Sequence, residues 1–411
     1  MTVLEYSRKR LEACLEEVAN QKSLDFPYSH SELALDKIED TFRYHLGGLE
    51  MLSEDDSDQD TIRGACIAAL VEIFNYIPLL GFILRSTDVR NAFEIHGPLL
   101  SLSRKILGEE ARLVVSSEWD YSPFTYHGIP QLPSFVLMGL PAPESANPLL
   151  LSLAGHELGH PIWSQSGLER ELRPDIESTI LREIELRWDE CSDFFPPSAK
   201  KALGDDLTVR ERWRPALKWA LSHAKETFCD FVGLRLFRES FLHAFSYLLA
   251  PGGDRSPAYP AWSARVSNLV QAANAYQLRV PPGYQSLFED SQPPDVLSQS
   301  IFLLSLADAA SQAVVPKLVK RADDIIETAS IDEGSEAGVE DIYNGIRLHI
   351  VPARNPVALS DILNAGWRAF HDPKLWEEKK FDRKVRERTL KELLLKSIEV
   401  LEYNTRTKAS T

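Results

Sequence analysis

The sequence contains little cysteine: Cys14, Cys66, Cys191 and Cys229 stand singly among 411 residues. No CxxC pair or regular cysteine framework occurs, so the pattern predicts reduced thiols, as in cytosolic proteins, rather than a disulfide scaffold. Because 44% of the residues are hydrophobic, a chain of this length can build a core without disulfides or structural metals.

Basic residues are also fewer than acidic residues. There are 45 Lys and Arg against 61 Asp and Glu, which gives a formal net charge of −16. An excess of acid is repelled by nucleic acid and by anionic membranes. We therefore expect neither a nucleic acid nor a membrane among the partners of this chain.

A secretory leader and a membrane span are not expected either. The first residues are charged and helix-periodic, without an apolar run followed by a cleavage site. The longest apolar stretch, residues 64–84, contains Glu72, Asn75 and Pro78, and a lone carboxylate in the middle of a bilayer is costly. The stretch therefore predicts a buried helix that breaks near Pro78, in a soluble cytoplasmic protein.

The motifs of several common enzyme classes are missing from the sequence. GxxxxGK[ST], GxGxxG and GxSxG do not occur. The sequence therefore gives no support for a P-loop nucleotide-binding protein, a Rossmann dinucleotide-binding protein or a serine hydrolase of the GxSxG kind.

The hydrophobic pattern predicts a predominantly α-helical α+β fold, and the length suggests two or three packed units. Helical periodicity runs through an N-terminal region, residues 1–110. Two short runs bounded by proline and glycine, 111–119 and 134–141, are predicted strands. They begin a core, 111–280, in which we expect a small antiparallel sheet beside an active-site helix. Residues 281–411 form a C-terminal helical region.

The segment that carries chemistry has the pattern HExxH, from His156 to His160, on an apolar helical run. Residues four apart on a helix are turned by only about 40°, so both imidazoles project from one face and can reach one zinc ion. Glu157 lies further round the helix, where its carboxylate can act as general base on a metal-bound water. The alternative is a helix with two core histidines whose hydrogen bonds are satisfied within the protein.

A catalytic zinc needs a third protein ligand, and two of the ExxxD pairs that follow are the candidates. Glu185 and Asp189 have the charged surroundings of a solvated helix face. Asp230 instead lies in a run of apolar residues, where a carboxylate must be paired. We therefore favour Glu226 as the ligand, with Asp230 accepting a hydrogen bond from a ligand imidazole. Glu185 remains the rival, and His223 is a possible substitute.

HELGH at 156–160 followed by ETFCD at 226–230 resembles the gluzincin group of zinc metallopeptidases, the thermolysin-like arrangement of HExxH and ExxxD. The resemblance covers about a third of the chain, roughly 111–245. It implies that zinc is bound by His156, His160 and Glu226, that Glu157 is the general base, and that Asp230 is the partner of a histidine. It also implies that strand 134–140 lies at the rim of the substrate cleft.

Two further features bear on this interpretation. Pro161 follows the second histidine directly and cannot donate a helical hydrogen bond, so the helix is expected to end or bend at 160–161. An additional group should stabilise the oxyanion of amide hydrolysis. Tyr259 is the first candidate for that group, with His243 and Arg265 behind it. For each of the three, a structural role is the favoured alternative.

The sequence thus predicts a zinc-dependent peptidase that acts on a peptide or protein, with Zn²⁺ as cofactor. An alternative of another class is a helical interaction or regulatory scaffold whose zinc site is structural or inactive. The flanking helical regions and Pro161 motivate this alternative. Substrate, cleavage specificity, latency and oligomeric state are left open by the sequence.

Overall fold

A computed structural model describes residues 2–54, 57–89, 92–196, 200, 203–291, 298–351, 358–377 and 380–409. The chain forms two compact units, Met1–Ala146 and Asn147–Thr411. Both are built mainly of helices, and a small mixed sheet lies in the first. The expectation of a predominantly helical α+β fold is confirmed.

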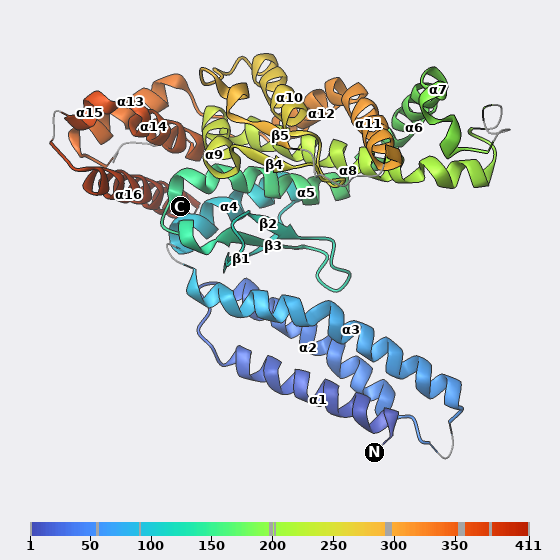
Figure 1. The fold of residues 1–411 in the computed structure, drawn as a ribbon. Coiled ribbons are helices and arrows are strands. Elements are labelled where there is room, and N and C mark those ends of the chain that lie inside the picture. Colours follow the sequence, from blue (N-terminus) through green and yellow to red (C-terminus); the bar gives the residue numbers. More distant parts are fainter. Residues whose placement is uncertain are drawn as a thin grey trace. The chain divides into compact units, whose positions relative to one another are not determined.

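The first unit begins with three long helices that lie side by side (Figure 1): α1 (Val3–Lys22), α2 (Ser29–Glu50) and α3 (Gln59–Arg85). Helix α1 starts with a capping box, in which the Thr2 side chain accepts from the Glu5 backbone and the Glu5 side chain accepts from that of Thr2. The buried faces of the three helices form one apolar cluster with residues of the sheet that follows. A fourth helix, α4 (Ala92–Leu107), packs against the first strand.

Helix α3 differs from the expected broken helix. It runs without interruption through Pro78, and one face is buried while Phe74 on another is 70% exposed. By length and composition α3 is apolar enough to cross a membrane, and a bent pair of helices in the second unit also passes that test. A core helix passes the same test, so this finding does not place the chain in a membrane.

The sheet of the first unit has the strand order β1 (Arg112–Glu118), β3 (Phe135–Pro141), β2 (Phe124–Tyr126). Strands β1 and β3 are the two predicted strands, but they pair in parallel, from Arg112 opposite Phe135 to Glu118 opposite Pro141. Strand β2 is antiparallel to β3. The prediction of an antiparallel sheet is therefore wrong for the main pair. Parallel neighbours need a long connection, and the segment 119–134 supplies one.

The second unit is organised around one long helix, α8 (Leu207–Phe237). Before it come a 3₁₀ segment (Pro148–Leu153), α5 (Ala154–Ser166), α6 (Leu168–Leu186) and α7 (Trp188–Cys191). After it come α9 (Glu239–Leu249), β4 (Gly252–Asp254), α10 (Trp262–Ala275), β5 (Glu289–Ser291), α11 (Ser298–Ala313), α12 (Val315–Thr328), α13 (Glu336–Leu348), α14 (Leu359–His371), α15 (Pro373–Glu377) and α16 (Arg383–Ala409). Helices α5, α6, α10, α11 and α12 all contact α8.

The two units differ from the three regions expected, 1–110, 111–280 and 281–411. The strands group with the N-terminal helices, because β1 packs on α2, α3 and α4. Helices α11 and α12 group with the HExxH segment, because both pack on α8. The sheet therefore belongs to the first unit and the HExxH helix to the second.

Candidate functional site

The HExxH motif lies on α5, and α5 packs directly on α8. Glycine makes this close approach possible. A Cβ added at Gly159 would lie 2.6 Å from the Cα of Cys229, and one added at Gly155 would lie 2.8 Å from the Cα of Gly233. The two helices therefore cross with little side-chain volume between them, which brings the motif face of α5 onto one face of α8.

His156 is held at both ring nitrogens by carboxylates of α8. Its Nδ1 lies 2.8 Å from Oδ1 of Asp230, and its Nε2 lies 3.3 Å from Oε2 of Glu226. Burial disfavours the charged imidazolium, but the hydrogen bonds to Asp230 and Glu226 outweigh it and raise the pKa of His156 to about 10. In the absence of metal, His156 is therefore protonated at neutral pH.

The second histidine and the expected general base lie beside this pair. The Nε2 atom of His160 is 3.9 Å from Oε2 of Glu157, and Glu157 is only 4% exposed. The ring centroids of His156 and His160 are 5.0 Å apart, with the rings nearly perpendicular. The structure thus brings all five sequence-predicted residues together: His156, Glu157, His160, Glu226 and Asp230.

The two carboxylates of α8 remain ionised although they are buried. Burial opposes ionisation of Glu226, but the hydrogen bond and charge of His156 hold the pKa of Glu226 well below its usual range. Burial likewise opposes ionisation of Asp230, but the charge and hydrogen bonds of Arg265 lower the pKa of Asp230. Both groups can therefore act as anions, one toward a cation and the other toward an imidazole.

Arg265 of α10 has the structural role that was the alternative to binding the oxyanion. Its Nε lies 2.6 Å from Oδ2 of Asp230, and an Nη lies 2.8 Å from Oδ1 of the same residue. The guanidinium is buried and also lies over the rings of Phe245 and Trp262. Because Asp230 occupies it in this two-point pair, Arg265 orders the carboxylate that holds His156 rather than facing a substrate.

Sequence reasoning missed this pairing, although a signal for it was present. Arg265 shares the buried face of α10 with Leu269 and Ala272, at helical spacing. A lone arginine on an otherwise apolar helix face must have an acidic partner, because an unpaired buried charge costs several kcal/mol. Asp230, in its own apolar run, is the carboxylate in need of such a partner.

The rival ligands lie elsewhere. Glu185 on α6 and Asp189 on α7 are exposed to solvent. His223 is buried, but its Nε2 lies 3.2 Å from the carbonyl oxygen of Pro257 and its Nδ1 3.3 Å from Asp308. The geometry therefore favours Glu226 over Glu185 and over His223 as the third ligand.

Tyr259, the first oxyanion candidate, interacts electrostatically with the carboxylates of the site. Burial raises the pKa of its phenol, and the charges of Glu226 and Glu157 raise it further. His243 instead stacks on Trp367, with ring centroids 5.4 Å apart. The assignment of Tyr259 as the oxyanion group stays a prediction.

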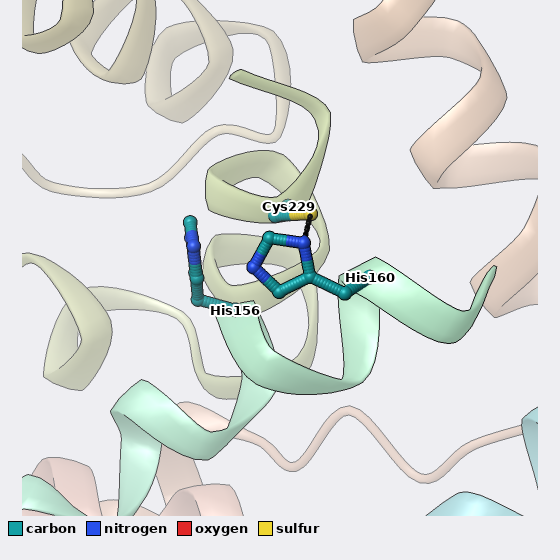
Figure 2. Close-up of side chains that lie close together, drawn as sticks. All are labelled: His156, His160 and Cys229. Carbon is teal, nitrogen blue, oxygen red and sulfur yellow. Dashed lines mark hydrogen bonds between the residues drawn. The ribbon is translucent and has the colours of Figure 1, made fainter. Parts of the chain in front are cut away.

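Cys229 was not singled out from the sequence, yet it lies at the centre of the α5–α8 crossing. Its Sγ shares a hydrogen bond of 3.5 Å with Nδ1 of His160 (Figure 2). Burial raises the pKa of this thiol well above its usual value, and the nearby carboxylates add to the effect. Its position three residues after Glu226, on the same helix face, was the available signal.

Helix α5 does not end at His160. It continues from Ala154 through Pro161 to Ser166. Of the two alternatives expected at 160–161, an end or a bend, the end is therefore wrong. Proline removes a single backbone hydrogen bond at this point. The packing of Trp163 on Phe228 of α8, with ring centroids 5.7 Å apart, helps to hold the helix beyond the proline.

The sheet strand predicted at the rim of the cleft, β3, belongs to the other unit, so its relation to the motif stays a prediction. No family model matches this sequence, and neither a curated protein nor a solved structure is significantly similar to it.

Proposed function

We propose that this chain is a zinc-dependent peptidase of the gluzincin kind, which hydrolyses a peptide bond in a peptide or protein. One observation carries the proposal. The two carboxylates of the ExxxD pair, Glu226 and Asp230, hold opposite nitrogens of the first HExxH histidine, at 3.3 and 2.8 Å. Nε2 of His156 and Oε2 of Glu226 are then close enough to bind the same cation.

The donor set fits zinc. Two imidazoles and one carboxylate are a ligand set of catalytic zinc sites. Two such ligands on one tetrahedral ion, with bonds of about 2.0–2.2 Å, lie about 3.4 Å apart. The His156 Nε2 and Glu226 Oε2 atoms are 3.3 Å apart. Zn²⁺ held by His156, His160 and Glu226 would supply Lewis acidity, lowering the pKa of water and polarising the scissile carbonyl.

Side chains of the protein would carry out the proton transfers, orient the ligands and stabilise the oxyanion. Glu157, beside His160, would accept a proton from the attacking water and return it to the leaving amine. With a cation bound, His156 would have lost its Nε2 proton, and Asp230 would hold the remaining proton on Nδ1, leaving the Nε2 lone pair for the cation. Arg265 keeps Asp230 ionised and in place. Tyr259 is the residue that we assign to stabilising the oxyanion.

The burial of the site's carboxylates supports a second function, that of a scaffold. Glu157 and Glu226 are 4% and 5% exposed, so a substrate carbonyl has little direct access to the general base in this conformation. Low access favours an interaction or regulatory scaffold in which the zinc is structural or the peptidase is inactive. The same five residues would then serve to bind zinc without turnover.

Metal analysis and a peptide-library digest separate these functions. We expect one zinc per chain, cleavage by the wild type, and no cleavage by Glu157→Gln with zinc retained. Glu169→Gln is the matched control, because Glu169 lies on the exposed face of α6. A wild type that holds zinc but leaves every peptide intact would favour the scaffold. Zinc far below one per chain would overturn both functions.

A further inference from the structure

Cys229 adds a sulfur atom to the cluster of metal-binding side chains on α5 and α8. One ligand atom from each of His156, His160 and Cys229 lies within 4.8 Å of the other two. Figure 2 shows the three side chains, with a ring nitrogen of His160 directed at the sulfur. The zinc set proposed above does not use this sulfur.

The spacing of these atoms matches that of two ligands on one cation. With the bond lengths of zinc, about 2.05 Å to nitrogen and about 2.3 Å to sulfur, a tetrahedral ion separates the two ligand atoms by about 3.6 Å. His160 Nδ1 and Cys229 Sγ are 3.5 Å apart. The helix crossing brings the two residues together, because the Cα of Cys229 lies close to Gly159, the neighbour of His160.

Two imidazoles with one thiolate prefer a different kind of cation from two imidazoles with one carboxylate. Sulfur ligands favour soft, thiophilic cations, whereas carboxylate oxygen favours harder ones. Cys229 is fully buried, and a site closed to solvent favours a compact metal–thiolate bond over a hydrated ion.

We propose that His156, His160 and Cys229 form a second ligand set, which takes thiophilic cations such as Cd²⁺ or Cu⁺ in competition with zinc. On binding, the thiol releases its proton to solvent and a sulfur–metal bond forms, with no change of oxidation state. A neutral imidazole has one free lone pair, so His160 can serve through Nδ1 or through Nε2 but not both. The two sets are therefore mutually exclusive, and soft cations act as inhibitors of zinc loading. This site does not require that the chain hydrolyse peptides.

The test is a titration of the metal-free full-length protein with Cd²⁺, followed by the ultraviolet charge-transfer absorbance of the sulfur–cadmium bond. We expect a saturable band at one Cd²⁺ per chain in the wild type, which Cys229→Ser lacks. Loss of a residue that hydrogen-bonds to a metal ligand lowers the metal affinity by about 10–100-fold. Loss of a ligand itself should therefore lower the Cd²⁺ affinity by at least about 100-fold. Cys66→Ser is the control, because Cys66 is equally a buried cysteine but lies in the first unit.

Absence of the band in the wild type, or its persistence in Cys229→Ser, would overturn the proposal. Cadmium NMR of the wild type gives a second test that needs no variant: a resonance typical of nitrogen and oxygen ligands alone also overturns it. Zinc analysis of the same samples keeps this site separate from the proposed function. A wild type that forms the cadmium band but never holds zinc retains the sulfur site and loses the peptidase.

Discussion

The Nδ1 atom of His156 lies 2.8 Å from Oδ1 of Asp230, although 74 positions separate the two residues in the sequence. The contact joins the two halves of the motif, HExxH on α5 and ExxxD on α8. It also decides which nitrogen of His156 can face a cation, because the proton stays on the side of the carboxylate. Most of the functional proposal follows from this contact.

Replacing Asp230 with Asn should weaken zinc binding by about 10–100-fold, because the amide is a poorer acceptor for the imidazole proton and no longer raises ligand basicity. Competition with a chromogenic chelator measures the change in affinity. Asp189→Asn is the control, since Asp189 is the exposed aspartate of the rival ExxxD pair. An equal loss of zinc affinity in both variants would contradict the role assigned to Asp230.

Replacing Glu226 with Gln should abolish stoichiometric zinc binding, because an amide oxygen lacks the charge that balances the cation. The matched change at Glu185, which is exposed on α6, should leave one zinc per chain. Elemental analysis of both purified variants gives the comparison. Zinc lost from Glu185→Gln and kept by Glu226→Gln would reverse the assignment of the third ligand.

The residues that lie within one helical turn of each other were predictable from the sequence. Helical spacing places His156 beside His160 and Glu226 beside Asp230, and the apolar run around Asp230 indicated that this carboxylate needs a partner. The structure places the imidazole of His156 against this carboxylate, as expected of a ligand histidine. Its second partner, Arg265, was not predicted, since it comes from another helix, 35 positions after Asp230. Local periodicity carries no information about which helices pack together.

Two other expectations depended on long-range packing in the same way. The direction in which β1 and β3 pair is set by how the connection 119–134 returns, which strand propensity does not encode. The course of α5 through Pro161 is decided by its packing on α8, which offsets the lost hydrogen bond. Sequence patterns predicted which segments are helices and which are strands. They did not predict which of these elements pack against one another.

Replacing Gly159 with Ala should destabilise the second unit, because the new methyl group would lie 2.6 Å from the Cα of Cys229 and force α5 away from α8. Overpacking of this kind typically costs about 1–3 kcal/mol. Thermal unfolding followed by circular dichroism measures the effect, and zinc content should fall with it.

Gly64→Ala is the control for this change. Gly64 also lies in a helix, but nothing lies within 4 Å of its added Cβ, so alanine should stabilise α3 by about 0.5–1 kcal/mol. A Gly159→Ala variant as stable as the wild type would show that the two helices are not held as closely as the structure indicates.

His243 should make the second unit sensitive to acid. Burial, with a smaller contribution from the charge of His371, lowers the pKa of His243 to about 4. The unfolded chain, with a histidine pKa of about 6.5, binds more protons between these values, so stability is fully present above about pH 6.5 and is lost as pH falls toward 4. The shift corresponds to about 3 kcal/mol. Denaturant unfolding at pH 7 and pH 4 should show a smaller loss in His243→Phe, which keeps an aromatic ring on Trp367 but cannot titrate. An equal loss in both proteins would place the acid sensitivity at other groups.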